Sequence, residues 1–429
     1  QPDEILDTRL QNHEEIGPLP PGTYHFSIRS KDYAGNWSPY YSSFGPIVIR
    51  EALPVDLVCS QNMGWDFPLV PRSNAVATQF DVQLTPSLPG DTAGTWWNYS
   101  GNNLGEDPVP GDAFTVGLYL DGAVIQEFTT PAIGGNETYL ALNVGPVSVP
   151  GGRHTLEIRH DSQGEVAEAD EDNNIWARQF VWTPQPLVPG VVTLVTESLP
   201  DPSGGHEWIE DGIPVFPNCR GFAFNGGIGW DAVSLVNLDH VDDFDLSMFA
   251  ASTGSEDGFM SPLALSDHDF EEVDIVFVNG NNMGAKTWNL GVTYDRGTDS
   301  GDYQLQHVQS APLPPTGSRV VGLNVGDPVD LTETFFSSAT GPITVSLSAD
   351  PAFLDGTIRI GRLAPQTQYS SMNPLQDVHL LPLGGYLEFE ITNPQEGSNC
   401  FVVWRDPRDS QADVYLRLEI TPQRPNIVP

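Results

Sequence analysis

The sequence predicts an all-β protein built from tandem β-sandwich modules. Apolar and polar residues alternate with a period of two along much of the 429 residues, and helical periodicity is missing. Glycine (42) and proline (38) are abundant, as in short strands joined by tight turns, while 39% hydrophobic residues are too many for disorder. At about 100–150 residues a module, the length predicts about three or four modules. We expect four units: residues 1–50, 51–184, 187–312 and 317–424.

The first unit is predicted to be part of a module. Residues 21–49 are expected to form a hairpin, with Tyr24, Phe26 and Ile28 on one face. The turn sequence DYAGNWS resembles the F–G hairpin that ends a fibronectin type III domain. Only 20 residues precede Pro21, whereas such a domain needs about seven strands. Two explanations stay open: the sequence is part of a longer polypeptide, or the missing strands come from another chain or a processed precursor.

Residues 54–184 carry a series of motifs in a fixed order. Asp56-Leu57 opens a strand, Leu118–Gly122 forms a hairpin with an Asp-Gly turn, and Gly152–Leu156 begins another strand. An acidic turn at 168–174 then ends in Asn-Asn before the last strand. This order resembles CARDB, the bacterial cell-adhesion-related domain of the immunoglobulin-like type. The resemblance implies an immunoglobulin-like sandwich and a role in adhesion at the cell surface.

One segment departs from the family pattern. Residues 90–112 form a long glycine-rich insertion that carries Trp96 and Trp97. We expect an exposed, elaborated loop, which makes it a candidate contact site. The alternative is that both tryptophans cap the open end of the sandwich, since tryptophan usually finds a core.

The units 187–312 and 317–424 are predicted to be two further sandwiches of the jelly-roll-like kind. Residues 242–246 and 302–305 resemble two strands of the pre-peptidase C-terminal domain, which is found beside secreted peptidases, and we extend this resemblance over 187–421. The layout of 400–420 mirrors that of 276–308, which predicts a tandem pair. Proline-bearing joints are expected to act as semi-rigid spacers at residues 183–189, 312–317 and 422–429.

The charge balance limits the partners. With 57 acidic and 18 basic residues the formal net charge is -39, and lysine occurs only at Lys31 and Lys286. We therefore expect no nucleic-acid partner and no binding to anionic membranes. Such a surface suits a salty medium, divalent cations or solubility alone. No apolar run is long enough to insert into a membrane, and we expect any export signal to lie upstream of Gln1.

The acidic turn at 165–174 is the candidate metal site. Its side chains Glu168, Asp170, Asp172 and Asn173 crowd hard oxygen ligands into one turn. Ca²⁺ prefers this chemistry and takes about six to eight oxygens. The spacing differs from that of an EF-hand, and the central glycine of that motif is missing.

Motifs of catalysis are missing from the sequence. GxSxG, HExxH, a Walker loop and a GxGxxG after a strand do not occur. His154 and His160 are six residues apart on one predicted strand and face the same side, so a metal and ordinary packing are both open. Two sets of acids with histidine, around His240 and His268, would be split between the faces of strands. We predict that the chain is not an enzyme.

The three cysteines are far apart in the sequence. Cys59, Cys219 and Cys400 have no CxxC spacing, which excludes the usual zinc and redox motifs. Cys219 and Cys400 fall in neighbouring modules, so a disulfide between modules in an oxidising compartment and buried free thiols are both open.

These observations predict a non-catalytic extracellular or cell-surface protein for structure or adhesion. Its partner would be a protein or glycan on a surface, or copies of itself in a filament or surface layer. The alternative is the C-terminal accessory region of a large secreted hydrolase such as a peptidase. A third hypothesis is carbohydrate binding through exposed aromatic residues, for which the candidates are Trp96, Trp97, Trp208 and Trp230.

Overall fold

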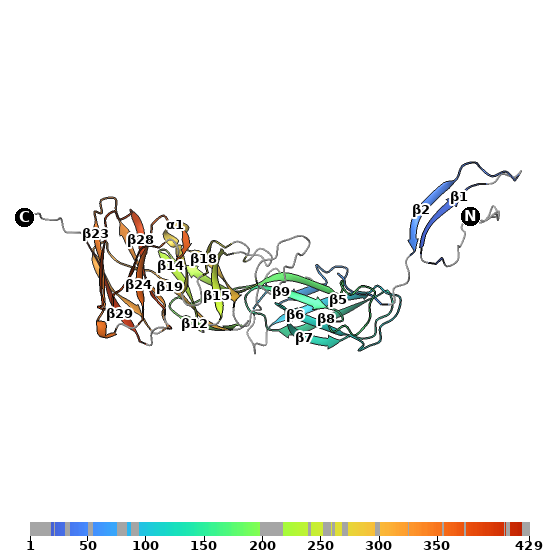
Figure 1. Cartoon of the computed structure of the whole chain (residues 1–429), viewed down its shortest axis with the longest axis horizontal. Coiled ribbons are helices and arrows are strands. Elements are labelled where there is room, and N and C mark those ends of the chain that lie inside the picture. Colours follow the sequence, from blue (N-terminus) through green and yellow to red (C-terminus); the bar gives the residue numbers. More distant parts are fainter. Residues whose placement is uncertain are drawn as a thin grey trace, which may run out of the picture.

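The structure is a computed structural model that describes residues 19–20, 22–30, 35–49, 55–74, 84–86, 94–197, 218–238, 242–251, 259, 262–267, 273–296, 301–324, 326–353, 356–372, 375–406, 408 and 412–422. Strands dominate these ranges, and their helical structure is confined to α1 (Gly280–Met283) and the 3-10 turn η1 (Pro351–Phe353). The all-β prediction is confirmed (Figure 1). The four-unit division stays a prediction, and we use it to name the modules.

The first module contributes a two-stranded hairpin, β1 (Gly22–Ile28) and β2 (Ser42–Ile49). The pairs Tyr24–Ile47 and Phe26–Phe44 lie opposite each other, which puts apolar side chains on one face, as predicted for Tyr24 and Phe26. Residues 31–34 of the predicted turn lie outside the described residues.

The second module is a sandwich of two sheets. In one sheet β5 pairs with β3, β4 and β8, and in the other β9 pairs with β6 and β10, while β6 also pairs with β7. The predicted Asp121-Gly122 turn joins β6 to β7, with both residues at positive φ. The strands are β3 (Leu57–Cys59), β4 (Leu69–Arg72), β5 (Thr95–Asn103), β6 (Thr115–Leu120), β7 (Ala123–Thr129), β8 (Glu137–Val147), β9 (Gly152–Arg159) and β10 (Ile175–Trp182).

The predicted exposed loop at 90–112 is wrong at its centre, because residues 95–103 form β5. The side chains of Trp97 and Tyr99 point into the core between the sheets, and Trp97 is 1% exposed. Alternate residues of β5 meet the opposite sheet, and Asn98 and Ser100 on its other face are buried as well, so both faces of this strand are covered. Trp96 is only partly exposed, so neither tryptophan is a free platform for a ligand.

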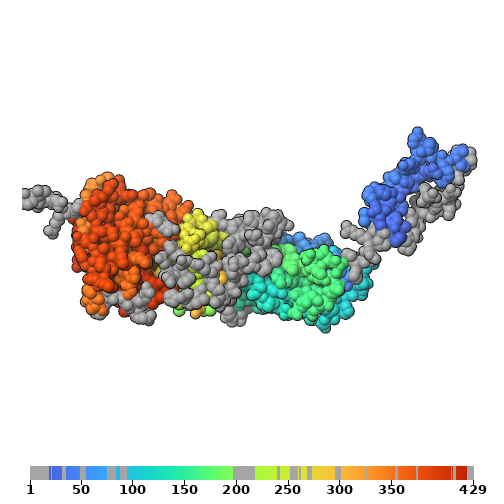
Figure 2. Space-filling model, viewed as in Figure 1, coloured from blue at the N-terminus to red at the C-terminus, as the bar shows by residue number. Residues whose placement is uncertain are grey.

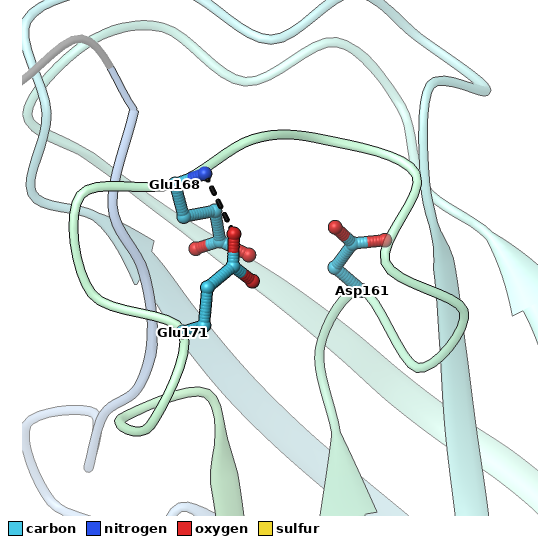
Figure 3. A group of neighbouring side chains, drawn as sticks. All are labelled: Asp161, Glu168 and Glu171. Carbon is cyan, nitrogen blue, oxygen red and sulfur yellow. Dashed lines mark hydrogen bonds between the residues drawn. The ribbon is translucent and has the colours of Figure 1, made fainter.

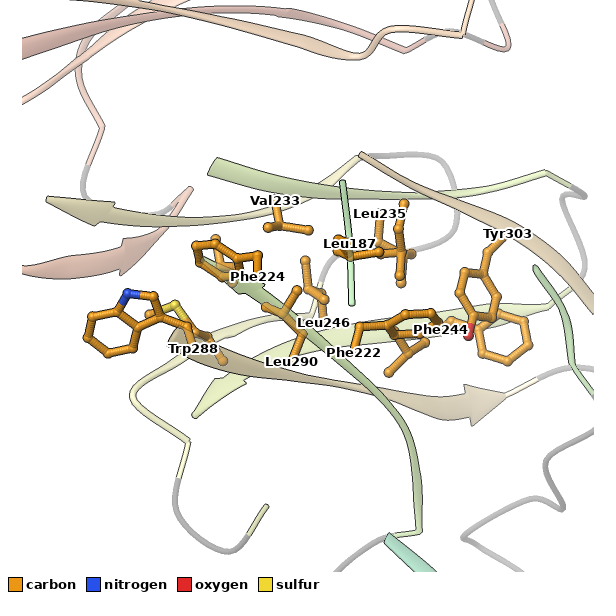
Figure 4. Close-up of a cluster of buried hydrophobic side chains, with 14 of the residues drawn as sticks. Leu187, Phe222, Phe224, Val233, Leu235, Phe244, Leu246, Trp288, Leu290 and Tyr303 are labelled. Atoms are coloured by element: carbon orange, nitrogen blue, oxygen red, sulfur yellow. The ribbon is translucent and has the colours of Figure 1, made fainter. Parts of the chain in front are cut away.

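The third and fourth modules share one topology. The strand orders β12-β19-β14-β17 and β13-β18-β15-β16 in the third module correspond to β21-β29-β23-β27 and β22-β28-β24-β26 in the fourth. The same strand order thus occurs twice in succession, which is the arrangement that a tandem pair would have. Figure 4 shows the apolar side chains that fill the third module between its two sheets.

The strands of these modules have the following bounds. The third module holds β11 (Gln185–Pro186), β12 (Val192–Glu197), β13 (Cys219–Gly226), β14 (Trp230–Asn237), β15 (Asp243–Ala250), β16 (Ala264–Ser266), β17 (Asp274–Asn279), β18 (Lys286–Arg296) and β19 (Gly301–Gln309). The fourth holds β20 (Ala311–Pro312), β21 (Gly317–Leu323), β22 (Val329–Phe336), β23 (Ile343–Ser348), β24 (Ile358–Leu363), β25 (Tyr369–Ser371), β26 (Gln376–Leu380), β27 (Tyr386–Ile391), β28 (Gly397–Arg405) and β29 (Val414–Pro422).

The joint between the second and third modules is part of a sheet rather than a spacer. Strand β11 pairs in parallel with β13, and β13 also pairs with β9 of the second module, so one nine-stranded sheet crosses the junction. Backbones touch here because Gly152 has no side chain: a Cβ at this position would overlap the carbonyl oxygen of Cys219. Val181, Phe249 and Phe259 pack with Cys219 over the same junction.

The joint between the third and fourth modules is buried in the same way. Strand β20 pairs in parallel with β22, and β25 of the fourth module adds to the sheet of the third. A shared apolar core lies between them, formed by residues such as Trp230, Phe277, Leu331 and Val402. Proline at these two joints therefore occupies short edge strands, where its missing N–H costs no ladder hydrogen bond. The third predicted joint, 422–429, lies outside the described residues except for Pro422.

All three cysteines are free thiols. Cys219 lies at the joint between the second and third modules, and Cys400 lies at the joint between the third and fourth. Each is surrounded by apolar side chains. Between the two alternatives left open by the sequence, the structure has buried free thiols, and burial raises the pKa of the Cys219 thiol to about 12.

Candidate metal centre in the acidic turn of the second module

The candidate site lies in the loop that joins β9 to β10. Asp161 sits at the start of this loop with a positive φ of 50°. Its carboxylate accepts the backbone N–H groups of Glu165 (2.7 Å) and Val166 (2.8 Å), which satisfies backbone donors that the turn leaves unpaired. Asp161 is buried, so its position is fixed by the loop that it organises.

Asp161, Glu168 and Glu171 form the acidic trio. Their carboxylates offer one oxygen each, and these oxygens lie within 4.8 Å of one another. Figure 3 shows Glu168 and Glu171 side by side, with Asp161 facing them from the start of the loop. The backbone N–H of Glu168 donates to Glu171 at 2.9 Å, which holds the two ends of the turn together. Three carboxylates this close repel one another unless a proton or a cation intervenes.

Glu168 ties the turn to the first strand of the module. Its carboxylate accepts the N–H of Leu57 at 2.5 Å and the side-chain amide of Asn174 at 3.0 Å. The pKa of Glu168 is raised to about 7, mainly by burial and in addition by the negative charges of Glu171 and Asp161, while these hydrogen bonds lower it. A cation bound by the trio would lower the pKa of Glu168, because it would favour the charged carboxylate.

The structure places the four sequence-predicted ligands differently from one another. Glu168 belongs to the trio, whereas Asp170 and Asp172 are exposed and the carboxylate of Asp170 accepts the N–H of Asp172 at 3.1 Å. Asn173 donates to Asp56 at 2.9 Å, and its amide oxygen is buried without a hydrogen bond in the described part of the chain. Asp161 was missed because it stands outside the acidic run. The ligand set therefore stays a prediction.

The donor set fits a hard divalent cation. Carboxylate and amide oxygens are the ligands that Ca²⁺ prefers, and the trio supplies at least three of the roughly six to eight that it takes. Each carboxylate oxygen has more than one lone pair, so the hydrogen bonds to the backbone leave room for a metal. The remaining ligands would be backbone carbonyls and water.

The histidines of this module are separate core residues. His154 and His160 face the same side of the strand, as predicted, and both are buried. Nδ1 of His154 lies 2.6 Å from Asp121, whereas Nδ1 of His160 lies 2.6 Å from the hydroxyl of Tyr139. Because each ring has its own partner, the packing interpretation holds for both. His240 and His268 lie outside the described residues, as do Asp269, Glu271 and Glu272, whereas Asp242, Asp243, Asp245 and Asp267 lie within them.

The comparisons with known proteins agree with the second module as described. The CARDB family model matches residues 97–178. This part of the chain is a CARDB domain. The match covers β5 to β10 except for the first two residues of β5 and the last four of β10, and it lies within the predicted range of 51–184. A search of curated proteins gave no match.

Solved structures similar to parts of the chain include a cell-surface protein domain and a CARDB domain. A domain of a cell surface protein from Methanosarcina acetivorans is 20% identical, with 30% of this chain and 91% of that one covered and a TM-score of 0.22. A CARDB domain from Pyrococcus furiosus, described in complex with di-metal ions, is 18% identical, with coverages of 30% and 94% and a TM-score of 0.21.

A third similar structure is the pre-peptidase C-terminal domain of a Bacillus anthracis collagenase. It is 14% identical to this chain, with 26% of this chain and 95% of that one covered and a TM-score of 0.22.

No helix in the described ranges is long and apolar enough to cross a membrane.

Proposed function

We propose that this chain is a non-catalytic structural or adhesion protein that works outside the cell or on its surface. The observation that carries the proposal is the continuity of the second, third and fourth modules. A sheet crosses one junction and a shared core fills the other, so these modules are held in a single line (Figure 2). A stiff shaft of this kind suits a protein that holds a binding surface away from its attachment point.

The CARDB domain supports the surface location, since the family is that of cell-adhesion-related domains. Protease treatment of intact producing cells tests the location: the chain should be cleaved while cytosolic markers survive. Deletion of the gene should reduce attachment of the cells to their surface. Unchanged attachment and complete protection from protease would contradict the proposal.

Copies of the chain are one possible partner. The edge strands β7 and β8 leave backbone groups that another strand could pair with, which is the basis of a filament or surface layer. Electron microscopy of the purified chain with and without millimolar Ca²⁺ tests this part, because regular polymers are expected only if copies associate.

We propose Ca²⁺ as the cation of the acidic trio. The close carboxylates and the raised pKa of Glu168 support it, since both describe charge that is incompletely balanced within the protein. Isothermal titration with CaCl₂ after chelator treatment is expected to show at least one site in the second module. Absence of any heat or change in thermal stability would remove Ca²⁺ from the proposal.

A second candidate function is the accessory region of a large secreted hydrolase such as a peptidase. The two stretches that resemble pre-peptidase domains face each other across the third module, with the rings of Phe244 and Tyr303 4.9 Å apart. Purification of the native protein from its source decides between the candidates. Peptidase activity that copurifies with these residues on one polypeptide would favour the hydrolase.

A further inference from the structure

The fourth module has an outward sheet face whose counterpart in the third module is covered. In the third module, β14 and β17 turn Trp230, Ile275 and Phe277 outward, and these apolar side chains are buried beneath the fourth module. The corresponding strands of the fourth module are β23 and β27. The tandem topology therefore identifies their outer face as the position where another module would dock.

The residues on this face are unlike those of a module junction. Where the third module has apolar side chains, β23 presents Thr344, Ser346 and Ser348, and β27 presents Glu388 and Glu390. Burial alternates along both strands, so these five side chains point away from the apolar core. A face of hydroxyls and carboxylates would be costly to bury under an apolar partner, so it differs from the apolar face that the third module buries at its junction.

Two tyrosines stand on either side of this polar strip. Tyr415 on β29 is 59% exposed, and its ring leans over Gly322 on β21, where a Cβ would lie 3.4 Å from the ring atom Cε1. Its hydroxyl donates to Asn324 at 3.4 Å. Aromatic cover over a glycine of the neighbouring strand fixes the ring in place. Tyr415 is therefore a largely exposed ring with a fixed position.

The second tyrosine lies across the strip. Tyr386 on β27 is 55% exposed, and its hydroxyl donates to Glu388 on the same strand. The register places Tyr386 opposite Ser348, which in turn lies opposite Arg417 on β29. Two strand spacings, about 10 Å, thus separate the Tyr386 strand from the Tyr415 strand. β23 lies between these two strands and its small side chains form the floor, while Tyr415 stands two residues before Arg417, past the end of β23.

We infer that this face, hereafter the tyrosine face, binds a neutral glycan chain, and the inference rests on the proposed adhesive function. The apolar C–H face of a sugar ring stacks on the negative face of an aromatic ring, and tyrosine supplies such a surface with little loss of side-chain entropy. Serine, threonine and glutamate oxygens on the floor and rims exchange hydrogen bonds with sugar hydroxyls. Both requirements meet on one exposed sheet.

The charges select against other partners. Glu388, Glu390 and Glu419 outnumber Arg417, which already lies 3.6 Å from Glu419, so an anionic glycan or a phosphate is repelled. A second copy of this chain would bring its own net charge of -39 to the same face. Figure 1 places β23 and β29 at the end of the module row opposite the hairpin.

The experiment is a titration of the full-length chain with soluble xylan, galactomannan, laminarin and hydroxyethylcellulose, with alginate as the anionic comparison. At least one neutral polymer is expected to bind, and alginate is not. Tyr386→Ala and Tyr415→Ala should each weaken binding roughly tenfold. Ser346→Gln, which fills the floor and keeps both rings, should weaken it as well.

The matched control is Tyr41→Ala, which removes an exposed tyrosine of the hairpin and should leave binding unchanged. Failure of all four neutral polymers to bind, or full binding by the Tyr386→Ala/Tyr415→Ala variant, overturns the inference. So does a result in which the two tyrosine substitutions only abolish self-association. Attachment to cells is measured in parallel: if it survives both substitutions, the glycan site is wrong while the adhesive function stands.

Discussion

At the scale of single residues, His160 illustrates how a buried polar group limits the conditions in which the fold is stable. Its ring lies in the core of the CARDB module and meets the hydroxyl of Tyr139 at 2.6 Å. Burial lowers the pKa of His160 to about 3, because the charged imidazolium would lose its water.

We predict that the contribution of His160 to the stability of the fold is lost in acid. In the unfolded chain His160 takes up a proton near pH 6.5, whereas the folded chain takes it up only near pH 3. The contribution of His160 to the free energy of unfolding is therefore fully present above pH 6.5. Below that pH it falls by about 1.4 kcal/mol per pH unit. Urea unfolding between pH 7 and 4 in chelator measures it. His160→Phe should flatten this slope, and an unchanged slope would contradict the assignment.

The acidic trio predicts a second effect at the same scale. Millimolar Ca²⁺ should raise the unfolding temperature of the chelator-treated chain by about 2–4 °C, because the ion binds only the folded loop. Glu168→Gln with Glu171→Gln should abolish this rise. Asp170→Asn is the matched control from the exposed part of the turn and should retain it. The opposite result would favour the exposed acids as ligands.

At the scale of elements, the contact of β9 with β13 joins two modules through their backbones. The N–H of Gly221 donates to the carbonyl of Gly151 at 2.6 Å, and Arg153 and Gly152 pair with Cys219 and Arg220. This contact between β9 and β13, hereafter the seam, depends on Gly152, because there is no space for a side chain at this position.

Gly152→Val is therefore expected to open the seam and to cost about 1–3 kcal/mol of stability, because the φ of 132° is also unfavourable for valine. Small-angle X-ray scattering should show a broader distribution of lengths, and the amide of Gly221 should exchange faster with deuterium. Gly341→Ala, where no atom lies near the added Cβ, is the control and should change neither measurement. A rigid Gly152→Val chain would show that the seam is unimportant.

At the scale of the whole molecule, the third and fourth modules share enough core to behave as one unit. Trp230 is 1% exposed at their junction, and its indole N–H donates to Ser398 of the fourth module at 3.0 Å. Asn281 of the third module donates to Glu333 of the fourth at 2.7 Å. Apolar and polar contacts thus both cross the junction.

Calorimetry of the full chain should show one common transition for these two modules. A chain that ends at residue 312 would expose Trp230, Ile275 and Phe277, and each large apolar side chain loses about 1.5–3 kcal/mol of burial. The shortened chain should therefore unfold at a lower temperature and bind the dye ANS. Two separate transitions, with equal stability of the shortened chain, would contradict a shared core.

The sequence by itself determined what depends on local pattern. Period-two alternation placed β14, β17, β23 and β29, and the Asp121-Gly122 turn fixed the hairpin of the CARDB domain, because strand faces and tight turns are set by neighbours in the chain. The acidic turn also located the loop of the candidate site, although its partner Asp161 was missed.

Only the tertiary structure decided what lies against each face. Alternation shows that Trp230 and Thr344 point away from a module's core, but it cannot show that one is covered by the next module and the other is not. The same holds for Trp97 in β5 and for the proline joints, whose partners are distant in sequence. Burial depends on contacts between segments far apart in the chain, and a local pattern contains no information about those partners.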